Sequence, residues 1–291
     1  MTLLPKNRHI SAAVAILGNK QGADALLAGL ESKAPESFHF IANQEKNITE
    51  AVLLLHNAGS TTTILATKPT GAIQADSISS LIVKGLQFAA THSSNLAQTI
   101  MGTQEPLLRQ AFEGAGFCAL STLTSMECAV PDTIRSVASP HNLKLTTMQH
   151  CTDKELESIL IDSYIGSLDC PKIHGIRLIT DIIAGHRDVL GYDANLWNIA
   201  KIQDEPTGVL LLNPVPEARC MELSYLGVSP KSRGSGLGDT LMHTAFKLTK
   251  RHGLTKITLA VDSLNTPAIE LYKRWNFQAT AQRFTMIKKL C

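Results

Sequence analysis

Several features that mark secreted or metal-binding proteins are missing from this sequence. The six cysteines contain no C-x-x-C pair, which argues against a zinc site and a disulfide framework and suits a reducing cytoplasm. The ten histidines form no H-x-x-x-H or H-E-x-x-H pattern, so we expect no metal site. These absences predict a cytoplasmic protein that binds no metal.

Long apolar runs are also missing. The stretch LIVKGLQFAA is interrupted by Lys84 and Gln87 and is too short to cross a bilayer. The opening residues MTLLPKNRH lack the apolar segment of a secretory leader. We therefore expect no membrane partner.

Neither sign of charge is in excess. Lys and Arg number 27 and Asp and Glu 25, which gives a net charge of +2 and no electrostatic case for binding nucleic acid. A basic cluster of Lys247, Lys250 and Arg251 lies in one predicted helix, where such residues usually form a solvated face. We expect no nucleic-acid partner.

The chain does contain enough apolar material for two domains. Its 291 residues are 44% apolar, and the Pro- and Ser-containing segment 131–142 separates two halves. In each half, predicted strands alternate with predicted amphipathic helices. In the second half, for example, the helix 238–253 precedes the buried strand 256–262. The pattern predicts a mixed α/β fold with domains at residues 1–135 and 143–291.

Several local signals define helix ends. Thr152 is placed as an N-cap, with Glu155 as its capping-box partner. Gly253 is placed to end a helix, and Pro267 fits the first turn of another. Asn276 follows that second helix, at a position that we expect to be left-handed, which asparagine tolerates.

The two halves resemble each other at an offset of 160 residues. Phe112 then falls on Tyr272, and the pairs Phe117/Phe277 and Met126/Met286 also coincide. A few matching apolar residues arise easily by chance, but the order of predicted elements is the same on both sides. We interpret this as a tandem duplication.

The stretch 222–242 is the most informative for chemistry. A strand ends, and Gly234, Gly236 and Gly238 then lead into a helix, so that backbone N–H groups can converge on an anion. Lys231 and Arg233 supply positive charge nearby. The glycine spacing fits neither the Rossmann fingerprint nor a Walker loop, and the alternative is a flexible surface loop. The pattern favours a site for a diphosphate.

This stretch resembles a known family. Arg233 to Gly238 match the [QR]-x-x-G-x-[GA] signature of the GCN5-related N-acetyltransferases (GNAT). Asn265, Ala268, Leu271 and Tyr272 resemble the family's N-x-x-A-x-x-L-Y pattern, whereas Asn276 departs from its usual G-F pair. The resemblance covers residues 220–289, and two such domains in one chain are similar to mycothiol synthase and its relatives. It implies a tandem GNAT fold with an intact C-terminal domain.

The resemblance implies a site for acetyl-coenzyme A. In the family, the strand 224–228 bends away from its neighbour at a bulge, the pantetheine arm pairs with the strand's free edge, and backbone N–H groups polarise the thioester. The residues that the resemblance assigns to cofactor binding are Leu226, Gly227, Val228, Arg233, Gly234, Ser235, Gly236, Leu237, Gly238, Asp239, Asn265, Ala268 and Tyr272.

Two of the residues are candidates for acid–base chemistry. The resemblance assigns Glu222 as the proton acceptor, because several members carry a strand glutamate there, and strand alternation places its side chain with Ser224 and Leu226. The alternative is a solvated or salt-bridged carboxylate. Tyr272 would donate a proton to the departing thiolate, or would only pack beneath the cofactor. Asn265 would contact the cofactor, cap a helix, or do both.

The first half lacks the residues of such a site. It carries Gly71 where the glycine loop would begin, an acidic Asp76 that would repel phosphate, and Phe112 in place of Tyr272. We predict that the N-terminal domain is degenerate and binds no coenzyme A.

The expected activity is that of an acyltransferase that moves an acetyl group from acetyl-coenzyme A to a primary amine of a small molecule or peptide. The alternative is a non-catalytic acyl-coenzyme A binding or sensor protein, and transfer to oxygen or of longer acyl chains stays open. The chain would be a monomer or a homodimer. His186 borders the expected acceptor region but is more typical of a loop or helix-end histidine.

Overall fold

The computed structural model describes residues 2–31, 33–44, 47–189 and 191–290. The chain forms two compact units, which we describe separately. Unit 1 comprises Met1–Ser121 together with Arg283–Cys291, and unit 2 comprises Thr122–Gln282. Within the described residues, no helix is long and apolar enough to cross a membrane.

Unit 1 is built on strands that follow one another in the sequence. The order is β1 (Thr2–Leu3), β2 (Phe38–Ala42), β3 (Ala51–Asn57), β4 (Thr61–Ala66), β5 (Leu96–Gly102) and the end of β12 (Gln278–Lys289). These strands pair antiparallel, except for the parallel pair β4 and β5. Its helices are α1 (His9–Leu17), α2 (Lys20–Glu31), α3 (Ala72–Thr91) and α4 (Pro106–Gly114).

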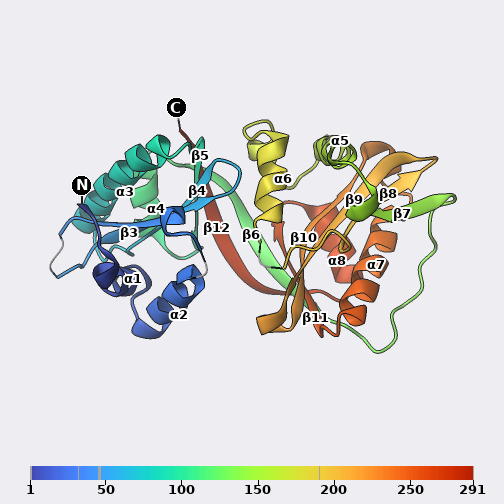
Figure 1. The fold of residues 1–291 in the computed structure, drawn as a ribbon, viewed down its shortest axis with the longest axis horizontal. Helices are drawn as coiled ribbons and strands as arrows, with labels where there is room; N and C mark the ends of the chain where they lie inside the picture. Colours follow the sequence, from blue (N-terminus) through green and yellow to red (C-terminus); the bar gives the residue numbers. More distant parts are fainter. Residues whose placement is uncertain (1, 32, 45–46, 190, 291) are drawn as a thin grey trace. The chain divides into compact units, whose positions relative to one another are not determined.

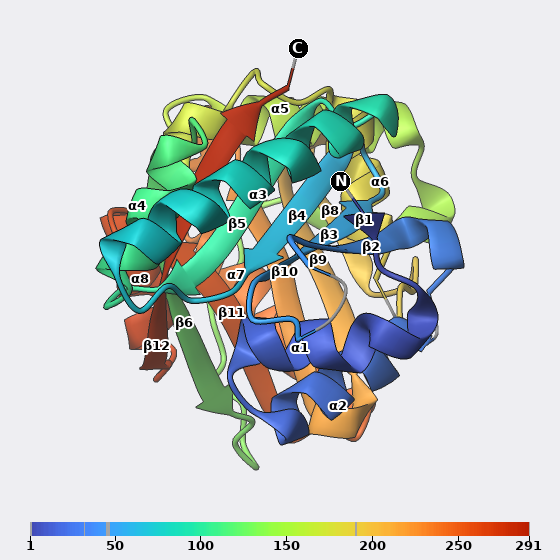
Figure 2. The same cartoon turned by 90° about the vertical axis from the view of Figure 1, so that its left-hand side faces the viewer.

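Helices pack on both faces of the strands of unit 1 because successive β3 side chains point in opposite directions. Val52 and Leu54 pack with apolar residues of α3 and α4, whereas Leu53 packs with those of α1 and α2. Figure 2 shows α3 running along the strands, apart from α1 and α2.

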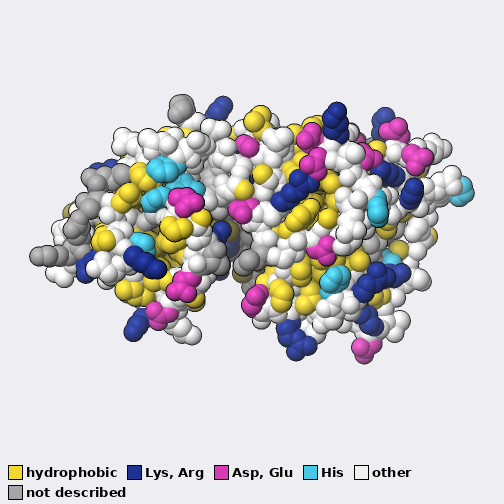
Figure 3. All heavy atoms as spheres, in the orientation of Figure 1, with side chains coloured by type: hydrophobic (Ala, Val, Ile, Leu, Met, Phe, Trp, Pro, Cys, Tyr) yellow, Lys and Arg dark blue, Asp and Glu magenta, His cyan; other side chains and the backbone are white. Residues whose placement is uncertain are grey.

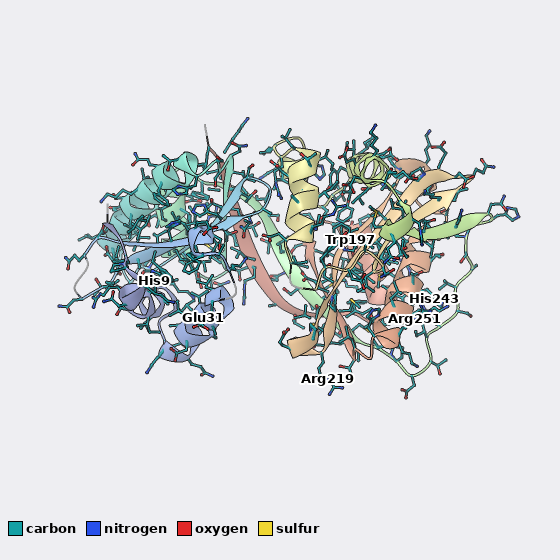
Figure 4. The ribbon with its side chains drawn as sticks, in the orientation of Figure 1. His9, Glu31, Trp197, Arg219, His243 and Arg251 are labelled. Carbon is teal, nitrogen blue, oxygen red and sulfur yellow. The ribbon has the colours of Figure 1, made fainter. Side chains whose placement is uncertain are left out.

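Unit 2 repeats this plan. Its strand order is the start of β12, then β6 (Cys118–Ala129), β11 (Lys256–Asp262), β10 (Cys220–Val228), β9 (Glu205–Val215), β8 (Trp197–Ile202) and β7 (Leu143–Thr147). The helices α5 (Asp153–Tyr164) and α6 (Ile179–Arg187) pack with Trp197, which is labelled in Figure 4. The helices α7 (Leu237–Arg251) and α8 (Thr266–Arg274) pack on the opposite face, with Leu210 and Leu212 (Figure 1).

The two units share one sequence of elements, as the duplication predicts. The strands β2 to β5 correspond in order and direction to β8 to β11. Each series contains one parallel pair of strands, β4–β5 and β10–β11. In each parallel pair, only three residues of one strand are paired with three of the other. The long helices α3 and α7 make the parallel crossovers, which require a connection of this length.

The last strand of each half is exchanged. β6 from the first half pairs with β11, and β12 from the second half pairs with β5. The compact units therefore do not coincide with the ranges 1–135 and 143–291 expected from the sequence. The expected linker also packs on unit 2, where Ile134 and Val137 contact its core.

The predicted helix ends are confirmed. Thr152 and Glu155 form a complete capping box at the start of α5. Pro267 lies in the first turn of α8, and both Gly253 (φ +68°) and Asn276 (φ 63°) adopt the left-handed conformation just beyond a helix.

Three histidines lie together in unit 1: His39 on β2, His56 on β3 and His92 just after α3. Their ring centroids are 5.2–5.3 Å apart, and His39 Nδ1 lies 3.2 Å from His56 Nε2. Histidine side chains are visible together on one face of this unit in Figure 3. Among the described residues, no group of His, Cys, Asp or Glu is placed to bind a metal ion. Burial lowers the pKa of His39, and that of His56 to about 4, from the ordinary 6.5.

We expect the protein to lose stability as the pH falls from about 6.5 towards 4. In this range the unfolded chain binds a proton at His56 that the folded chain resists, so acid favours unfolding; at pH 5 the loss is about 1–2 kcal/mol. His56→Gln should reduce this acid sensitivity, whereas His150→Gln at an exposed position should not. Urea unfolding of the unaltered protein, His56→Gln and His150→Gln at pH 7.5 and pH 5 measures the loss of stability in each. Equal acid sensitivity in His56→Gln and the unaltered protein would contradict the expectation.

Candidate functional site

The parallel strands β10 and β11 separate soon after they meet. They pair only from Cys220/Lys256 to Glu222/Thr258, whereas β10 stays paired with β9 as far as Val228. The register of β10 against β9 shifts between Leu223 and Tyr225, which marks a bulge. The edge of β10 that faces β11 is therefore open from Leu223 onward. The expected bulge and divergence of the strand are confirmed.

A cavity of about 380 Å³ lies where the strands separate. It is bounded by β10, by the start of α7, by α8 and by the chain that follows α5. Eight of the predicted site residues line it: Leu226, Gly227, Val228, Arg233, Gly238, Asn265, Ala268 and Tyr272. The lining residues that the sequence analysis did not single out for the site are Ser163, Gly166, Ser167, Leu168, Asp169, Leu223, Ser224, Tyr225, Ala260, Val261, Pro267 and Leu271.

The glycine loop leads into α7 without a side-chain cap. Gly234 and Gly236 have φ of +76° and +84°, a conformation that glycine adopts without steric cost. Gly236 is the N-cap residue of α7, and no side chain accepts a hydrogen bond from the first turn there. The first N–H groups of this 15-residue helix are thus available to an anion, and the helix dipole favours one.

The third glycine of the loop has a packing role. A Cβ at Gly238 would approach the Leu271 side chain to 3.3 Å, so glycine allows α7 and α8 to pack closely. Arg233 braces the loop: Nε donates to Val228 O at 3.3 Å and Nη2 to Ser163 O at 3.0 Å. Ser235 Oγ donates to Ser232 O, and Leu237 is buried in the core. Gly234, Ser235, Gly236 and Leu237 do not line the cavity itself.

The carboxylate of Asp239 is engaged elsewhere. It accepts hydrogen bonds from Arg135 at 2.8 Å, from Arg274 at 3.0 Å and from Trp275 Nε1 at 2.8 Å. Arg135 also stacks on the Trp275 ring, 4.0 Å from its centroid. The structure therefore places the Asp239 side chain in a network that holds the segment 131–142 on unit 2, while the assignment of Asp239 to cofactor binding stays a prediction.

Tyr272 is buried in the wall of the cavity, with 6% of its surface exposed. Its ring lies 5.7 Å from that of Phe277, and burial raises the pKa of its hydroxyl. Asn265 Oδ1 accepts the N–H of Ala268 at 3.4 Å, which confirms the predicted cap of α8. A phenol that keeps its proton is suited to act as a proton donor.

Glu222 lies outside this cavity. It borders a neighbouring hollow of about 240 Å³, together with Glu127 and Thr258. Glu222 is paired with Asn213 in the strand register, and Asn213 Nδ2 donates to Ser224 Oγ at 2.8 Å. Burial raises the pKa of the Glu222 carboxyl, although part of its side chain is exposed.

The bulge corrects one expectation for Glu222. Before the bulge, Met221 and Leu223 face the core under α7, whereas after it Leu226 contacts that same core. The alternation of β10 is thus reversed between Leu223 and Leu226. Glu222 shares its face of the strand with Ser224, as predicted, but not with Leu226.

His186 is in the last turn of α6, at a helix end as the sequence indicates. Its ring lies 6.2 Å from that of Tyr225 and 6.4 Å from that of Trp197. Burial lowers the pKa of His186 to about 4. The side chain is therefore a neutral part of the packing beneath α6.

The corresponding place in unit 1 differs in chemistry. The loop from β4 to α3 is short, and Gln74 Oε1 accepts the Thr70 N–H at 2.8 Å just before the helix. Phe112 is fully buried at the position that corresponds to Tyr272. The cavity beside β4 and β5, about 350 Å³, contains a 2.6 Å ion pair between Lys68 and Glu105.

Residues 167–277 match the sequence profile of the acetyltransferase (GNAT) family. N-acetyltransferase 8F1 of Rattus norvegicus is 29% identical over 118 residues, which cover 39% of this chain and 53% of the relative. Mycothiol acetyltransferase of Pseudarthrobacter chlorophenolicus is 41% identical over 56 residues, which cover 19% of this chain and 17% of the relative. The chain thus spans about half or less of the length of these curated relatives.

Solved structures share the fold over the whole chain. A GCN5-related N-acetyltransferase from Sphaerobacter thermophilus has a TM-score of 0.66 at 15% identity, covering 97% of this chain and 91% of that one. A tandem GNAT protein from the clavulanic acid biosynthesis pathway has a TM-score of 0.57 at 12% identity, and the match covers 100% of this chain and 98% of that one. Residues 167–277 of this chain therefore match the acetyltransferase (GNAT) family, and the chain has the fold of the solved tandem GNAT protein.

Proposed function

We propose that this protein transfers an acetyl group from acetyl-coenzyme A to a primary amine of a small molecule or peptide. The observation that carries the proposal is the open edge of β10, from Leu223 to Val228, beside the uncapped start of α7. An extended amide chain can pair with such an edge, and a diphosphate can bind at such a helix start. The names of the relatives, which describe acetyltransferases, agree with this proposal.

The residues present fit acetyl-coenzyme A. Gly234 and Gly236 have no side chain that could block the N–H groups at the start of α7. Arg233 adds positive charge to the same loop. The cavity continues from this loop along β10 to Tyr272. When bound, the cofactor supplies an activated acetyl group as a thioester.

Each catalytic role belongs to a residue near the point where β10 and β11 separate. The backbone N–H of Val228 would polarise the thioester carbonyl, because Ser229 N donates to Thr207 O of β9 and strand alternation then directs the Val228 N–H to the open edge of β10. The amine nitrogen forms a bond to the acetyl carbon while the carbon–sulfur bond breaks. Tyr272 would give its proton to the departing sulfur, and Glu222 would take the proton that the amine loses. We assign Glu222 on the sequence pattern, since it is the last residue of β10 before the strands diverge.

Glu222→Gln tests this assignment and separates an enzyme from a sensor. Because burial raises the pKa of Glu222, the rate should fall as the pH drops through that pKa and the carboxylate takes a proton. In Glu222→Gln this acid limb should vanish and kcat should fall about 100-fold. Glu127→Gln is the matched control, because Glu127 borders the same hollow and pairs with Lys256 at 2.9 Å.

The second candidate is a non-catalytic acyl-coenzyme A sensor. It is favoured by the position of Glu222 outside the cavity that Tyr272 lines. A sensor would bind acetyl-coenzyme A in both variants and release no thiol with any amine. Glu222→Gln with an unchanged pH–rate profile would contradict the role of Glu222 alone.

The cysteine pattern supports a cytoplasmic location for this protein, and Cys118, Cys128, Cys151, Cys170 and Cys220 are all free thiols. We keep a monomer or a homodimer as its assembly.

A further inference from the structure

The cavity beside β10 has charged side chains at two places. Among the residues that line it, Arg233 is basic and belongs to the glycine loop, and Asp169 is acidic and follows α5. The other lining side chains are apolar or uncharged. Arg233 adjoins the site that we propose for the diphosphate. Asp169 therefore needs a different explanation.

Asp169 is held in place by the end of β11. Asp262 N donates to Asp169 Oδ1 at 3.3 Å, and the Asn265 side chain also hydrogen-bonds to this carboxylate. In return, Cys170 N donates to Asp262 Oδ2 at 3.1 Å. Cys170 has φ +45°, an uncommon value for a residue with a side chain, so the contacts around it hold a strained turn. The position of Asp169 is thus set by specific bonds.

No ion pair among the described residues neutralises this acidic pair, although the charge of His174 acts on Asp169 and lowers its pKa. Asp262 is 2% exposed, and its carboxylate accepts backbone N–H groups of Cys170 and Leu264. None of the ion pairs among the described residues includes Asp169 or Asp262. Burial, and then the charge of Asp262, raise the pKa of the Asp169 carboxyl. A carboxylate in such surroundings is costly unless a positive group binds to it.

Asp169 lines the same cavity as Tyr272, the proposed proton donor. Its charge acts on the hydroxyls of Tyr272 in α8, Tyr225 in β10 and Tyr164 in α5. Tyr225 and Tyr272 line the cavity together with Asp169. An amine that attacks a thioester next to Tyr272 would therefore pass Asp169.

We propose that Asp169 binds the reacting amine of the acceptor as an alkylammonium ion, so that the acceptor is a basic alkylamine and not an arylamine or an alcohol. The inference rests on the proposed acetyl transfer and names its substrate class. Asp169 selects and places the ammonium ion, which loses one proton to water before it attacks and a second proton to Glu222 as the amide forms. No motif around Asp169 indicates this role in the sequence.

The test compares three nucleophiles of similar size, n-butylamine, aniline and n-butanol, with the full-length protein and saturating acetyl-coenzyme A. We expect release of coenzyme A with n-butylamine, with kcat/KM at least about 10-fold above that for the other two. Asp169→Asn should raise KM for n-butylamine about 10- to 100-fold while the Kd for acetyl-coenzyme A stays within about 2-fold. Asp169→Glu, which keeps the charge, should recover part of the loss.

Asp162→Asn is the matched control, because Asp162 lies on α5 outside the cavity. An unchanged KM for n-butylamine in Asp169→Asn would overturn the inference, as would a preference for aniline or n-butanol. Binding of acetyl-coenzyme A without transfer to any of the three would overturn the proposed transfer and favour the sensor. Failure of the unaltered protein to bind acetyl-coenzyme A would instead overturn the proposed function.

Discussion

Replacing Gly236 by aspartate is expected to raise the Kd for acetyl-coenzyme A by at least about 100-fold. Gly236 has φ +84° and is the N-cap residue of α7, so a side chain there adds backbone strain. The new carboxylate would also lie at the positive end of the helix, where it would compete with the diphosphate for the same N–H groups. Calorimetric titration of acetyl-coenzyme A into the full-length variant measures the loss.

Gly253→Asp is the matched control for this experiment. Gly253 lies just past the other end of α7, has φ +68°, and has no atom within 4 Å of the position a Cβ would take. The same substitution there adds a similar strain and the same charge far from the glycine loop. Gly253→Asp should therefore bind acetyl-coenzyme A normally. Equal binding by both variants would show that the loop does not bind the diphosphate.

The unaltered protein should bind one acetyl-coenzyme A per chain in the same titration. Unit 1 has Phe112 in place of Tyr272, and the side chain of Gln74, in the first turn of α3, accepts the N–H of Thr70 in the loop before the helix. The whole chain is needed, because the end of β12 completes the strands of unit 1 beside β5. A fragment that stops at residue 140 would lack this strand. Two molecules bound per chain would show that unit 1 keeps a coenzyme site.

Tyr272→Phe is expected to lower kcat about 10- to 1000-fold and to leave the Kd for acetyl-coenzyme A within about 2-fold. The ring packs beside Phe277, and phenylalanine keeps that contact while it removes the proton donor. Unit 1 shows that this position accepts phenylalanine, since Phe112 is fully buried there and its ring lies 5.0 Å from that of Phe117. Steady-state kinetics and calorimetry together measure the two constants.

Tyr192→Phe controls for the loss of a tyrosine hydroxyl elsewhere in unit 2. Its ring packs on Trp197 with centroids 4.8 Å apart, away from the cavity. This variant should keep both kcat and Kd. If Tyr272→Phe turned over as fast as the unaltered protein, Tyr272 would be a packing residue beneath the cofactor and the proton would come from elsewhere.

The functional residues that the sequence analysis did not identify come from the chain after α5. Asp169 lies in no repeat or motif, and its contacts are made with Asp262 and Asn265, more than ninety residues away. Asp239 shows the converse. The glycine motif indicated a cofactor residue, but its side chain meets Arg135, which is 104 residues away in the sequence. In both cases the partner is distant along the chain, so no local pattern reports it.

Short-range signals were sufficient for the helix ends and the glycine loop, whereas the divergent strand was expected from the family resemblance. The capping box at Thr152, the left-handed Asn276 and the loop glycines Gly234 and Gly236 act through the backbone within a few residues, so a local pattern reports them. The mixed α/β class and the duplicated order of elements follow from periodicity in the same way.

Only the tertiary structure decided which strands pair and which side chains meet. The exchange of β6 and β12 depends on pairings between residues 127 to 139 apart for β6 with β11 and 181 to 193 apart for β12 with β5, so no local pattern reports it. The bulge in β10 reversed the face of Leu226 relative to Glu222, because one extra residue changes the alternation of every residue beyond it. The chemistry of the cavity also depends on long-range contacts, since hydrogen bonds from Asp262 and Asn265 hold Asp169 in the cavity that Tyr272 lines.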